Sequence, residues 1–397
     1  MRITIATPIL YNPTSPFNHI FKDIIGGFLD AGYEVERHVA VRDDNEDEFK
    51  YGYTGERIHY KKYIRKESEH GNIISRFLRD SFTTIKEAKG IRKTCADVLF
   101  EDVSYSSFWV VRAAKKKGMR VVAMLQDVWP DNAVQSGLIK QGGLLYRFFE
   151  LWQRYVYKKA DKIICISDDM KDFIAGKGVG EDKIEVIYNW GYSDEMVDIS
   201  WDDNAFVKKY RLNRDMFYAI YAGNIGKMQN VEIVVNAAKV LQDRSNIQFL
   251  IIGDGVRKKQ IQEMANGLKN ITMLPMQPAE LATHIYSAAS VNLIPLVAGG
   301  TKTAMPSKTG VVLACNKPVI FTFGKNAKFN NLLVSYHVGC SVDPDDEKAL
   351  ATEIERIYQT KTQLPSMSKS SEFLKDIFSR SKNKEKYVFA LRDTCNV

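Results

Sequence analysis

Short apolar runs alternate with longer amphipathic segments along most of the chain. In the first half, this pattern predicts strands at 2–8, 34–41, 97–102, 119–127, 161–167 and 183–189, and helices at 17–33, 73–94, 106–118, 142–160 and 168–178. A regular succession of strand and helix is typical of a parallel sheet, because each crossover places a helix on one face of the sheet. The first half is therefore predicted to be a parallel sheet covered on both faces.

The segment 189–204 interrupts this alternation with turn-forming and aromatic residues, after which strands and helices alternate again. A chain of 397 residues is long for one core and suits two domains. We predict an α/β protein of two doubly wound, Rossmann-like domains, 1–190 and 191–370, with a last helix at about 371–397 that packs back on the first. Ligands of open parallel sheets bind beyond the carboxyl ends of the strands, which predicts a site in a cleft that both sheets face.

The composition narrows the class of protein. Hydrophobic residues make up 45% and charged residues 26% of the chain, as in folded globular proteins. No apolar run approaches the roughly 20 residues that span a bilayer. The N-terminal segment is typical of a buried strand and lacks the features of a secretory signal. The five cysteines are scattered and form no C-x-x-C pair, which favours reduced thiols in a cytoplasmic protein over disulfides or a zinc site.

The excess of basic residues indicates an anionic partner. The formal charge is +8 and the pI is near 9.0, and the basic residues cluster at Lys61–Lys66, Lys86–Lys93 and Lys115–Lys117. Two interpretations stay open, a solvated face and attraction to an anionic membrane. The acidic run Asp43–Glu48 and the absence of a recognition helix, zinc finger or RNP motif argue against nucleic acid.

The predicted helix at 142–160 has an apolar face rich in aromatic residues. Its members are Leu144, Leu145, Phe148, Leu151, Trp152 and Tyr155. A stripe at this spacing is typical of a core face. Beside the basic first half of the chain, it also suggests peripheral contact with an anionic membrane, at the inner face of the plasma membrane.

Two segments of the second half each join a buried strand, a glycine turn and a helix. They are Tyr221–Leu241, with GNIG at 223–226, and Asn246–Ile261, with GDG at 253–255. Such a turn presents backbone N–H groups and a helix dipole to a phosphate. A single turn of this kind is also a common tight connection, but the repetition favours anion binding. The segment after the first strand, 6–19, contains no glycine, unlike the fingerprint of dinucleotide dehydrogenases.

Together these motifs resemble the family 4 glycosyltransferases of bacterial surface-polysaccharide assembly. The resemblance rests on the strings GNIGKMQN, GDG and ITMLPM, on IPLVAGGTKTAMPSKTGVVLACNKPVI, and on LQDVWPDN at 125–132. It implies a GT-B fold with the donor bound mainly by the second domain and the acceptor by the first. It further implies a retaining transfer of a hexose or N-acetylhexosamine from a nucleotide-sugar, commonly a UDP-sugar, without a metal or other cofactor. The implied acceptor is a saccharide or a polyprenyl-diphosphate-linked sugar.

The resemblance also implies roles for individual residues. Lys227 and Lys308 would stabilise the charge on the leaving nucleotide, and Asp127 would accept a hydrogen bond from the acceptor or the donor sugar. The implied donor contacts are Gly223, Asn224, Gly226, Gly253, Asp254, Gly255, Arg257, Pro275, Met276 and Ser307. The implied acceptor contacts in the first domain are Asn18, His19, Gln126 and Trp129.

Several of these residues have plainer interpretations. A lysine on a loop is commonly only solvated, Asp127 could be a helix cap before Pro130, and a lone histidine such as His19 is commonly structural. Glu101 and Asp102 end the strand at 97–102, where they would line the site or cap the next helix.

One departure from the family leaves the activity open. The family usually has two glutamates separated by seven residues around the PSK string, and the aligned residues here are Thr303 and Val311. Valine cannot hold the ribose hydroxyls as the second glutamate does. This departure leaves open a catalytically silent nucleotide-sugar-binding partner of a transferase. A sugar-nucleotide epimerase of the same architecture is a further alternative.

Overall fold

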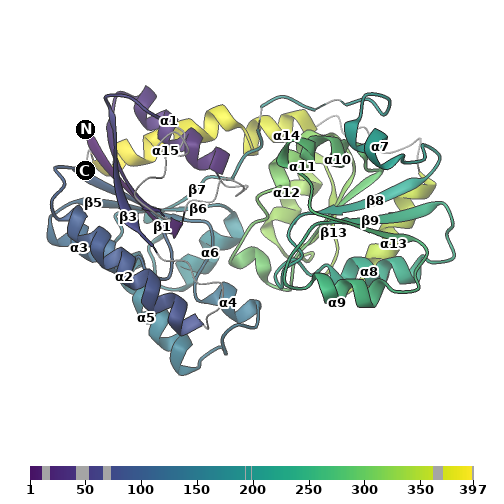
Figure 1. Ribbon diagram of the computed structural model, residues 1–397, viewed down its shortest axis with the longest axis horizontal. Coiled ribbons are helices and arrows are strands. Elements are labelled where there is room, and N and C mark those ends of the chain that lie inside the picture. The colour runs from purple at the N-terminus through teal and green to yellow at the C-terminus, as the bar shows by residue number, and fades with distance from the viewer. Residues whose placement is uncertain are drawn as a thin grey trace. The chain divides into compact units, whose positions relative to one another are not determined.

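The computed structural model describes residues 1–10, 18–41, 53–65, 73–192, 194–197, 199–360 and 370–395. The chain divides into two compact α/β units, each built on its own sheet (Figure 1). Unit 1 comprises Met1–Asn189, Lys302–Met305 and Ser381–Val397, and unit 2 comprises Trp190–Thr301 and Pro306–Arg380. The prediction of two doubly wound parallel sheets is confirmed.

Unit 1 has a seven-stranded parallel sheet in the order β3-β2-β1-β4-β5-β6-β7. Central strands such as β5 are buried on both faces, which is why they are continuous apolar runs. The order reverses between β1 and β4, so the loops after these two strands leave in opposite directions at a topological switch point. The strands are β1 (Arg2–Leu10), β2 (Glu34–Val41), β3 (Ile58–Ile64), β4 (Val98–Asp102), β5 (Arg120–Leu125), β6 (Lys162–Cys165) and β7 (Ile184–Val186).

The helices of unit 1 cover both faces of this sheet. The last of them comes from the C-terminus, and it is fixed there because Asn383 Nδ2 donates to Tyr188 O at 2.9 Å and the Tyr387 ring packs on Phe100. The helices are α1 (Asn18–Asp30), α2 (Ile73–Ile91), α3 (Phe108–Lys116), α4 (Asp131–Gln135), α5 (Leu144–Lys159), α6 (Asp168–Gly176) and α15 (Arg380–Cys395), with a 3₁₀ turn at Glu181–Lys183.

Unit 2 repeats the plan with six parallel strands in the order β10-β9-β8-β11-β12-β13, and its switch point lies between β8 and β11. The strands are β8 (Phe217–Ala222), β9 (Ile247–Ile252), β10 (Ile271–Leu274), β11 (Val291–Pro295), β12 (Val319–Thr322) and β13 (Cys340–Ser341). The helices are α7 (Ala205–Tyr210), α8 (Glu232–Val240), α9 (Lys258–Ala265), α10 (Ala282–Ala288), α11 (Thr309–Ala314), α12 (Lys328–Tyr336), α13 (Glu347–Gln359) and α14 (Ser370–Ile377), with 3₁₀ turns at Ala279–Leu281 and Gly300–Lys302.

Several elements differ from the sequence prediction. Strand β3 was not predicted, because it is an edge strand whose partly exposed lysines and tyrosines hide the apolar pattern. Helix α12 was not predicted either. The single helix expected at about 371–397 is two helices, of which α14 belongs to unit 2 and α15 to unit 1. The acidic run Asp43–Glu48 lies outside the described residues.

Candidate functional site

The two predicted glycine turns of unit 2 are packed against each other at the carboxyl ends of β8 and β9. Ile225 N donates to Asp254 O at 2.7 Å, and Arg257 N donates to Ile225 O at 3.0 Å. A Cβ on Gly253 would lie 1.9 Å from Gly223 O, so no side chain fits at this position. The glycines therefore allow two loops to share one small space beside the switch point.

Lys308 reaches this same place from the connection between β11 and α11. Its Nζ donates to Ala222 O at 2.9 Å and lies 4.0 Å from the centre of the Tyr221 ring. The hydroxyl of Tyr286 also donates to Ala222 O, at 3.3 Å. The side chain thus ends at the carboxyl end of β8, directly beside Gly223.

The ammonium group of Lys308 is unusual because it lacks a counter-ion. Among the described residues it forms no ion pair with an acidic side chain. Burial alone lowers the pKa of Lys308 to about 7. A desolvated ammonium group without a counter-ion is stabilised by an anionic ligand that enters the site.

The other predicted donor residues differ in how far they are buried and in whether they form ion pairs. Lys227 is half-buried in the loop before α8, whereas Arg257 is turned toward Glu232 of α8, with Nε and Oε1 3.5 Å apart. Lys258 pairs with Asp254 at 3.0 Å, and this ion pair lowers the pKa of the Asp254 carboxyl. Of the remaining predicted residues, Asn224 and the buried Gly226 lie in the first glycine turn. Pro275 and Met276 follow β10 and Ser307 precedes α11, and these three residues and Asn224 are exposed or half-exposed.

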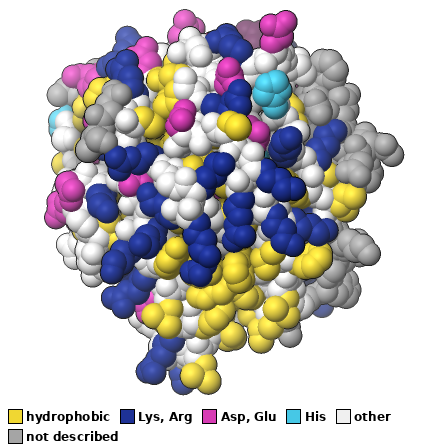
Figure 2. All heavy atoms as spheres, turned by 90° about the vertical axis from the view of Figure 1, so that its left-hand side faces the viewer, with side chains coloured by type: hydrophobic (Ala, Val, Ile, Leu, Met, Phe, Trp, Pro, Cys, Tyr) yellow, Lys and Arg dark blue, Asp and Glu magenta, His cyan; other side chains and the backbone are white. Residues whose placement is uncertain are grey.

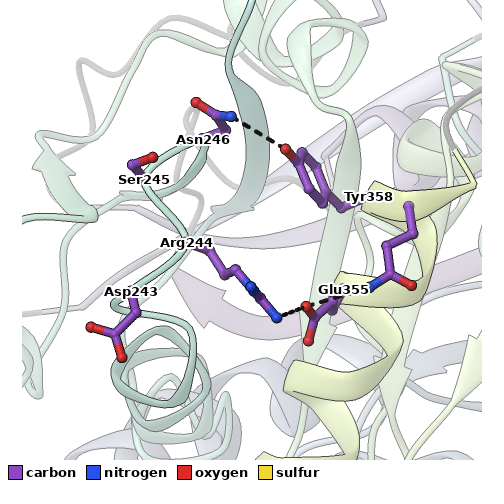
Figure 3. Close-up of a pocket in the computed structure, with 7 residues that line it drawn as sticks. Asp243, Arg244, Ser245, Asn246, Glu355 and Tyr358 are labelled. Atoms are coloured by element: carbon purple, nitrogen blue, oxygen red, sulfur yellow. Dashed lines mark hydrogen bonds and ion pairs between the residues drawn. The ribbon is translucent and has the colours of Figure 1, made fainter.

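A pocket of about 300 Å³ lies elsewhere in unit 2, and Figure 3 shows the side chains around it. It lies at the amino end of β9, away from the glycine turns. Arg244 pairs with Glu355, and Asn246 Nδ2 donates to the Tyr358 hydroxyl at 3.3 Å. Because these polar groups bind one another, the pocket is a weaker candidate than the glycine turns.

Unit 1 has carboxyl groups at the corresponding edge of its sheet. Glu101 and Asp102 end β4 and are buried, and Asp127 follows β5. Burial raises the pKa of Asp102 to about 7, with a further contribution from Asp127. Although part of Asp127 is exposed, the surrounding protein raises the pKa of its carboxyl to about 6, against an opposing hydrogen bond from Asn132. Burial also raises the pKa of Glu101 well above its ordinary value.

Next to these carboxyl groups, Gln126 and Asn189 form an amide pair. Asn189 Nδ2 donates to Gln126 Oε1 at 2.7 Å. The other two amide atoms, Gln126 Nε2 and Asn189 Oδ1, are buried and have no hydrogen-bond partner among the described residues. One donor and one acceptor at the carboxyl ends of β5 and β7 are therefore left unsatisfied by the described residues.

The structure places the other predicted acceptor residues differently. Trp129 packs its ring against Tyr105 and Phe149, each at 5.3 Å between ring centres, inside an aromatic cluster. His19 is half-buried in the first turn of α1, and the side chain of Asn18 lies outside the described residues.

The residues aligned with the missing glutamates lie in two different units. Thr303 is buried in unit 1, where its carbonyl accepts from Val128 N at 2.8 Å and its hydroxyl bonds Gln135. Val311 is buried in α11 of unit 2. Neither side chain carries a carboxylate.

Sequence reasoning missed three residues of these sites, Tyr221, Tyr286 and Asn189. The two tyrosines are hidden in apolar runs that read as core, and Asn189 lay in the predicted linker. The described residues contain no group of three metal-ligating side chains and no helix long and apolar enough to cross a membrane.

Comparison with known proteins gives matches to both units. The protein-family model described as "Glycosyltransferase Family 4" matches residues 20–190, and the family model described as "Glycosyl transferases group 1" matches residues 217–360. Among curated proteins, the chain is 25% identical over 245 residues to "Probable glycosyltransferase WbjE" of Pseudomonas aeruginosa, 60% of each chain. It is 26% identical over 247 residues to "Putative colanic acid biosynthesis glycosyl transferase WcaI" of Escherichia coli, 61% of this chain and 60% of that protein.

The chain thus matches about 60% of the length of these two relatives. Among solved structures, Anabaena HepE in complex with UDP and glucose has a TM-score of 0.71. The identity is 14%, and the match covers 99% of this chain and 100% of that one.

Proposed function

The chain belongs to the family 4 glycosyltransferases and has their GT-B fold, and we propose that it transfers a sugar from a nucleotide-sugar to a saccharide or lipid-linked acceptor. The name of WcaI, which refers to colanic acid biosynthesis, supports a role in surface-polysaccharide synthesis. The complexes of HepE with UDP support a UDP-sugar as donor. A hexose or an N-acetylhexosamine fits this class.

The observation that supports this function most strongly is the half-buried Lys308, which has no counter-ion among the described residues. A nucleotide diphosphate at the Gly223 turn would supply the missing negative charge, and the ammonium would in turn stabilise the charge that develops on the leaving nucleotide. Backbone N–H groups of the two glycine turns would add further donors, apart from those of Gly223, Ile225 and Gly253, which already donate to backbone carbonyls. In this proposal Lys308 and Lys227 neutralise the leaving group, and the transfer needs no bound metal or other cofactor.

On the acceptor side, unit 1 offers groups suited to a sugar hydroxyl. Asp127 or Asp102 would accept the hydroxyl proton, because a carboxyl with a pKa near neutrality can exchange protons at physiological pH. The free donor and acceptor of Gln126 and Asn189 would orient the acceptor. We propose that the product retains the anomeric configuration of the donor, in agreement with the resemblance to the family.

A thermal-shift screen tests the donor site. The protein is titrated with UDP, GDP, dTDP, ADP and CMP, with magnesium and with EDTA, because a ligand of the folded state must raise the melting temperature. We expect a shift with UDP that is the same in both conditions and is lost in Lys308→Met. Lys302→Met, at an exposed lysine in the same connection, is the matched control and should keep the shift. No shift with any nucleotide would contradict the donor site.

Donor hydrolysis separates the transferase from the two alternatives. A transferase without acceptor slowly releases sugar from its own donor, whereas a silent binding partner shows the thermal shift and releases none. An epimerase would instead return an isomer of the nucleotide-sugar. Chromatography of the donor after a long incubation distinguishes free sugar, isomer and unchanged donor.

A further inference from the structure

On helix α2, most of the buried side chains are polar, and several large apolar side chains are exposed. Its buried residues include Asp80, Ser81, Thr84 and Glu87. Its apolar residues Ile74, Leu78 and Phe82, spaced four apart along one face, are exposed, Leu78 by 62% and Phe82 by 63%. A helix that only covered its own sheet would bury the apolar stripe and expose the charges.

Helix α5 also exposes apolar side chains, although its buried side is itself largely apolar and aromatic. Its buried residues are Tyr146, Phe149, Gln153, Val156 and Tyr157. The stripe that sequence reasoning assigned to the core or to a membrane is largely exposed, with Leu144 exposed by 87% and Leu151 by 65%. The expectation that this stripe is a core face is therefore wrong for its aliphatic residues.

The two helices present their apolar stripes beside each other. The Phe77 ring of α2 lies 5.6 Å from Phe148 and 5.3 Å from Trp152 of α5, measured between ring centres. Phe108 of α3 packs on Trp152 at 4.4 Å. The aromatic rings fix the three helices together, so that the aliphatic side chains form one surface, here called the α2–α5 surface, made up of Ile74, Leu78, Phe82, Leu144, Leu145, Phe148 and Leu151.

The charged side chains around this surface have one sign. On α2, α3 and α5, every charged residue classed as exposed is basic, namely Arg76, Lys86, Lys89, Arg112, Lys116, Arg147, Arg154, Lys158 and Lys159. The acidic residues of these helices are buried or, in the case of Glu150, half-buried and 3.8 Å from Lys177. Figure 2 shows an apolar area of this face bordered by lysines and arginines.

We propose that the α2–α5 surface is a docking site for an anionic lipid bilayer. Apolar side chains would enter the boundary between headgroups and acyl chains, and the surrounding lysines and arginines would contact anionic headgroups. Lys86 already lies over the Phe82 ring at 4.7 Å, an arrangement in which the stem covers apolar surface while the charge stays in the polar layer. The docking of a second copy on the same surface is disfavoured, because a two-fold contact would bring the two basic borders together.

This inference rests on the proposed function only in the choice of a lipid-linked acceptor, and binding to vesicles tests it without any enzymatic step. Sedimentation of the full chain with phosphatidylcholine vesicles is compared with vesicles that also contain phosphatidylglycerol. We expect binding to the anionic vesicles that is at least about tenfold stronger and that weakens as salt is raised. The double variant Leu78→Gln/Leu151→Gln should lower binding by about tenfold or more.

Matched variants on unit 2 separate a specific surface from general adhesion. Val334→Gln removes an apolar side chain exposed by 56%, and Lys239→Gln/Lys259→Gln removes two exposed charges. Both should bind vesicles as the unchanged protein does, whereas Arg154→Gln/Lys158→Gln should bind more weakly. All substituted residues are exposed, so melting temperatures should agree and rule out unfolding as the cause.

Two results would overturn the proposal. One is equal binding of the unchanged protein and Leu78→Gln/Leu151→Gln to anionic vesicles. The other is a concentration-dependent dimer in sedimentation velocity that these two substitutions abolish, with no vesicle binding, which would make the surface an interface between copies. If vesicle binding is as expected but the nucleotide screen fails, the docking surface stands and the proposed function falls.

Discussion

The two units have the same strand order around their switch points and opposite charge beside them. In unit 2 the carboxyl end of β8 meets the ammonium of Lys308, and in unit 1 the carboxyl end of β4 presents Glu101 and Asp102. Burial shifts both kinds of group toward their neutral form, since it lowers the pKa of Lys308 and raises that of Asp102, each to about 7. Under the proposed function, topology selects where a ligand binds, whereas the residue type selects an anion in one unit and a hydroxyl in the other.

The largest expected effect comes from removing the space that the glycine turns of unit 2 share. In Gly253→Ala the new Cβ would collide with Gly223 O, so the loops must separate, and we expect unit 2 to lose on the order of 3 kcal/mol or more of stability. Chemical denaturation with fluorescence detection measures this loss.

Gly267→Ala provides the matched control for this substitution. Gly267 also has a positive φ, of 84°, but nothing lies within 4 Å of its Cβ position. It should cost only about 1 kcal/mol, the strain of the backbone conformation alone. Equal losses in the two variants would show that the turns do not depend on close contact.

The second prediction concerns the charge of Lys308. Its folded-state pKa of about 7 lies below the ordinary 10.5, so the unfolded chain binds the proton more tightly and stability rises with pH between these values. Lys308→Met removes the cost of burying the ammonium group, so the variant should melt above the unchanged protein at pH 7 and below. The difference in melting temperature should shrink toward pH 10. Nucleotide binding should behave oppositely, weakening several-fold between pH 6 and pH 8 in the unchanged protein as the ammonium loses its proton.

Calorimetry across this pH range measures both quantities. An unchanged melting temperature in Lys308→Met together with loss of nucleotide binding would mean that the ammonium is well solvated in the free protein. A nucleotide affinity that does not change between pH 6 and pH 8 would remove Lys308 from the donor site.

Much of this contrast could be predicted from the sequence, but not all of it. The alternation of strands and helices depends on local patterns, and it predicted the two sheets correctly. The PSK string singled out Lys308 through the family resemblance, and its role stays a prediction. That no acidic side chain of the described part of the chain pairs with Lys308, and that the ring of Tyr221 lies beneath it, depends on strands that meet only in the folded unit. The exposed stripe of α2 could not be predicted either, because periodicity identifies an apolar face without identifying what covers it.

The third prediction tests the carboxyl groups of unit 1. The folded-state pKa of Asp102, about 7, lies above the ordinary 3.8, so the folded chain binds the proton more tightly and stability falls as pH rises from about 4 to 7. Asp102→Asn lacks the ionised form, so it should melt a few degrees above the unchanged protein at pH 8 and about equally at pH 4. Lys308→Met is the opposite case, and a pH dependence of the same sign in both variants would contradict the difference in charge between the units.

The smallest expected effect comes from Thr303, five positions before Lys308. Thr303→Val removes a hydroxyl that bonds Gln135 in unit 1, and since Gln135 is only half-buried it can turn to water, so we expect a loss of about 0.5–1.5 kcal/mol. The nucleotide-induced thermal shift should remain, because Thr303 belongs to unit 1 and the donor site to unit 2. Thr303→Ser keeps the hydroxyl and should restore most of the stability. If Thr303→Val instead abolished the nucleotide-induced thermal shift, Thr303 would contact the donor as the family's glutamate does. The distinction between a structural Thr303 in unit 1 and a donor-binding Lys308 in unit 2 would then be wrong.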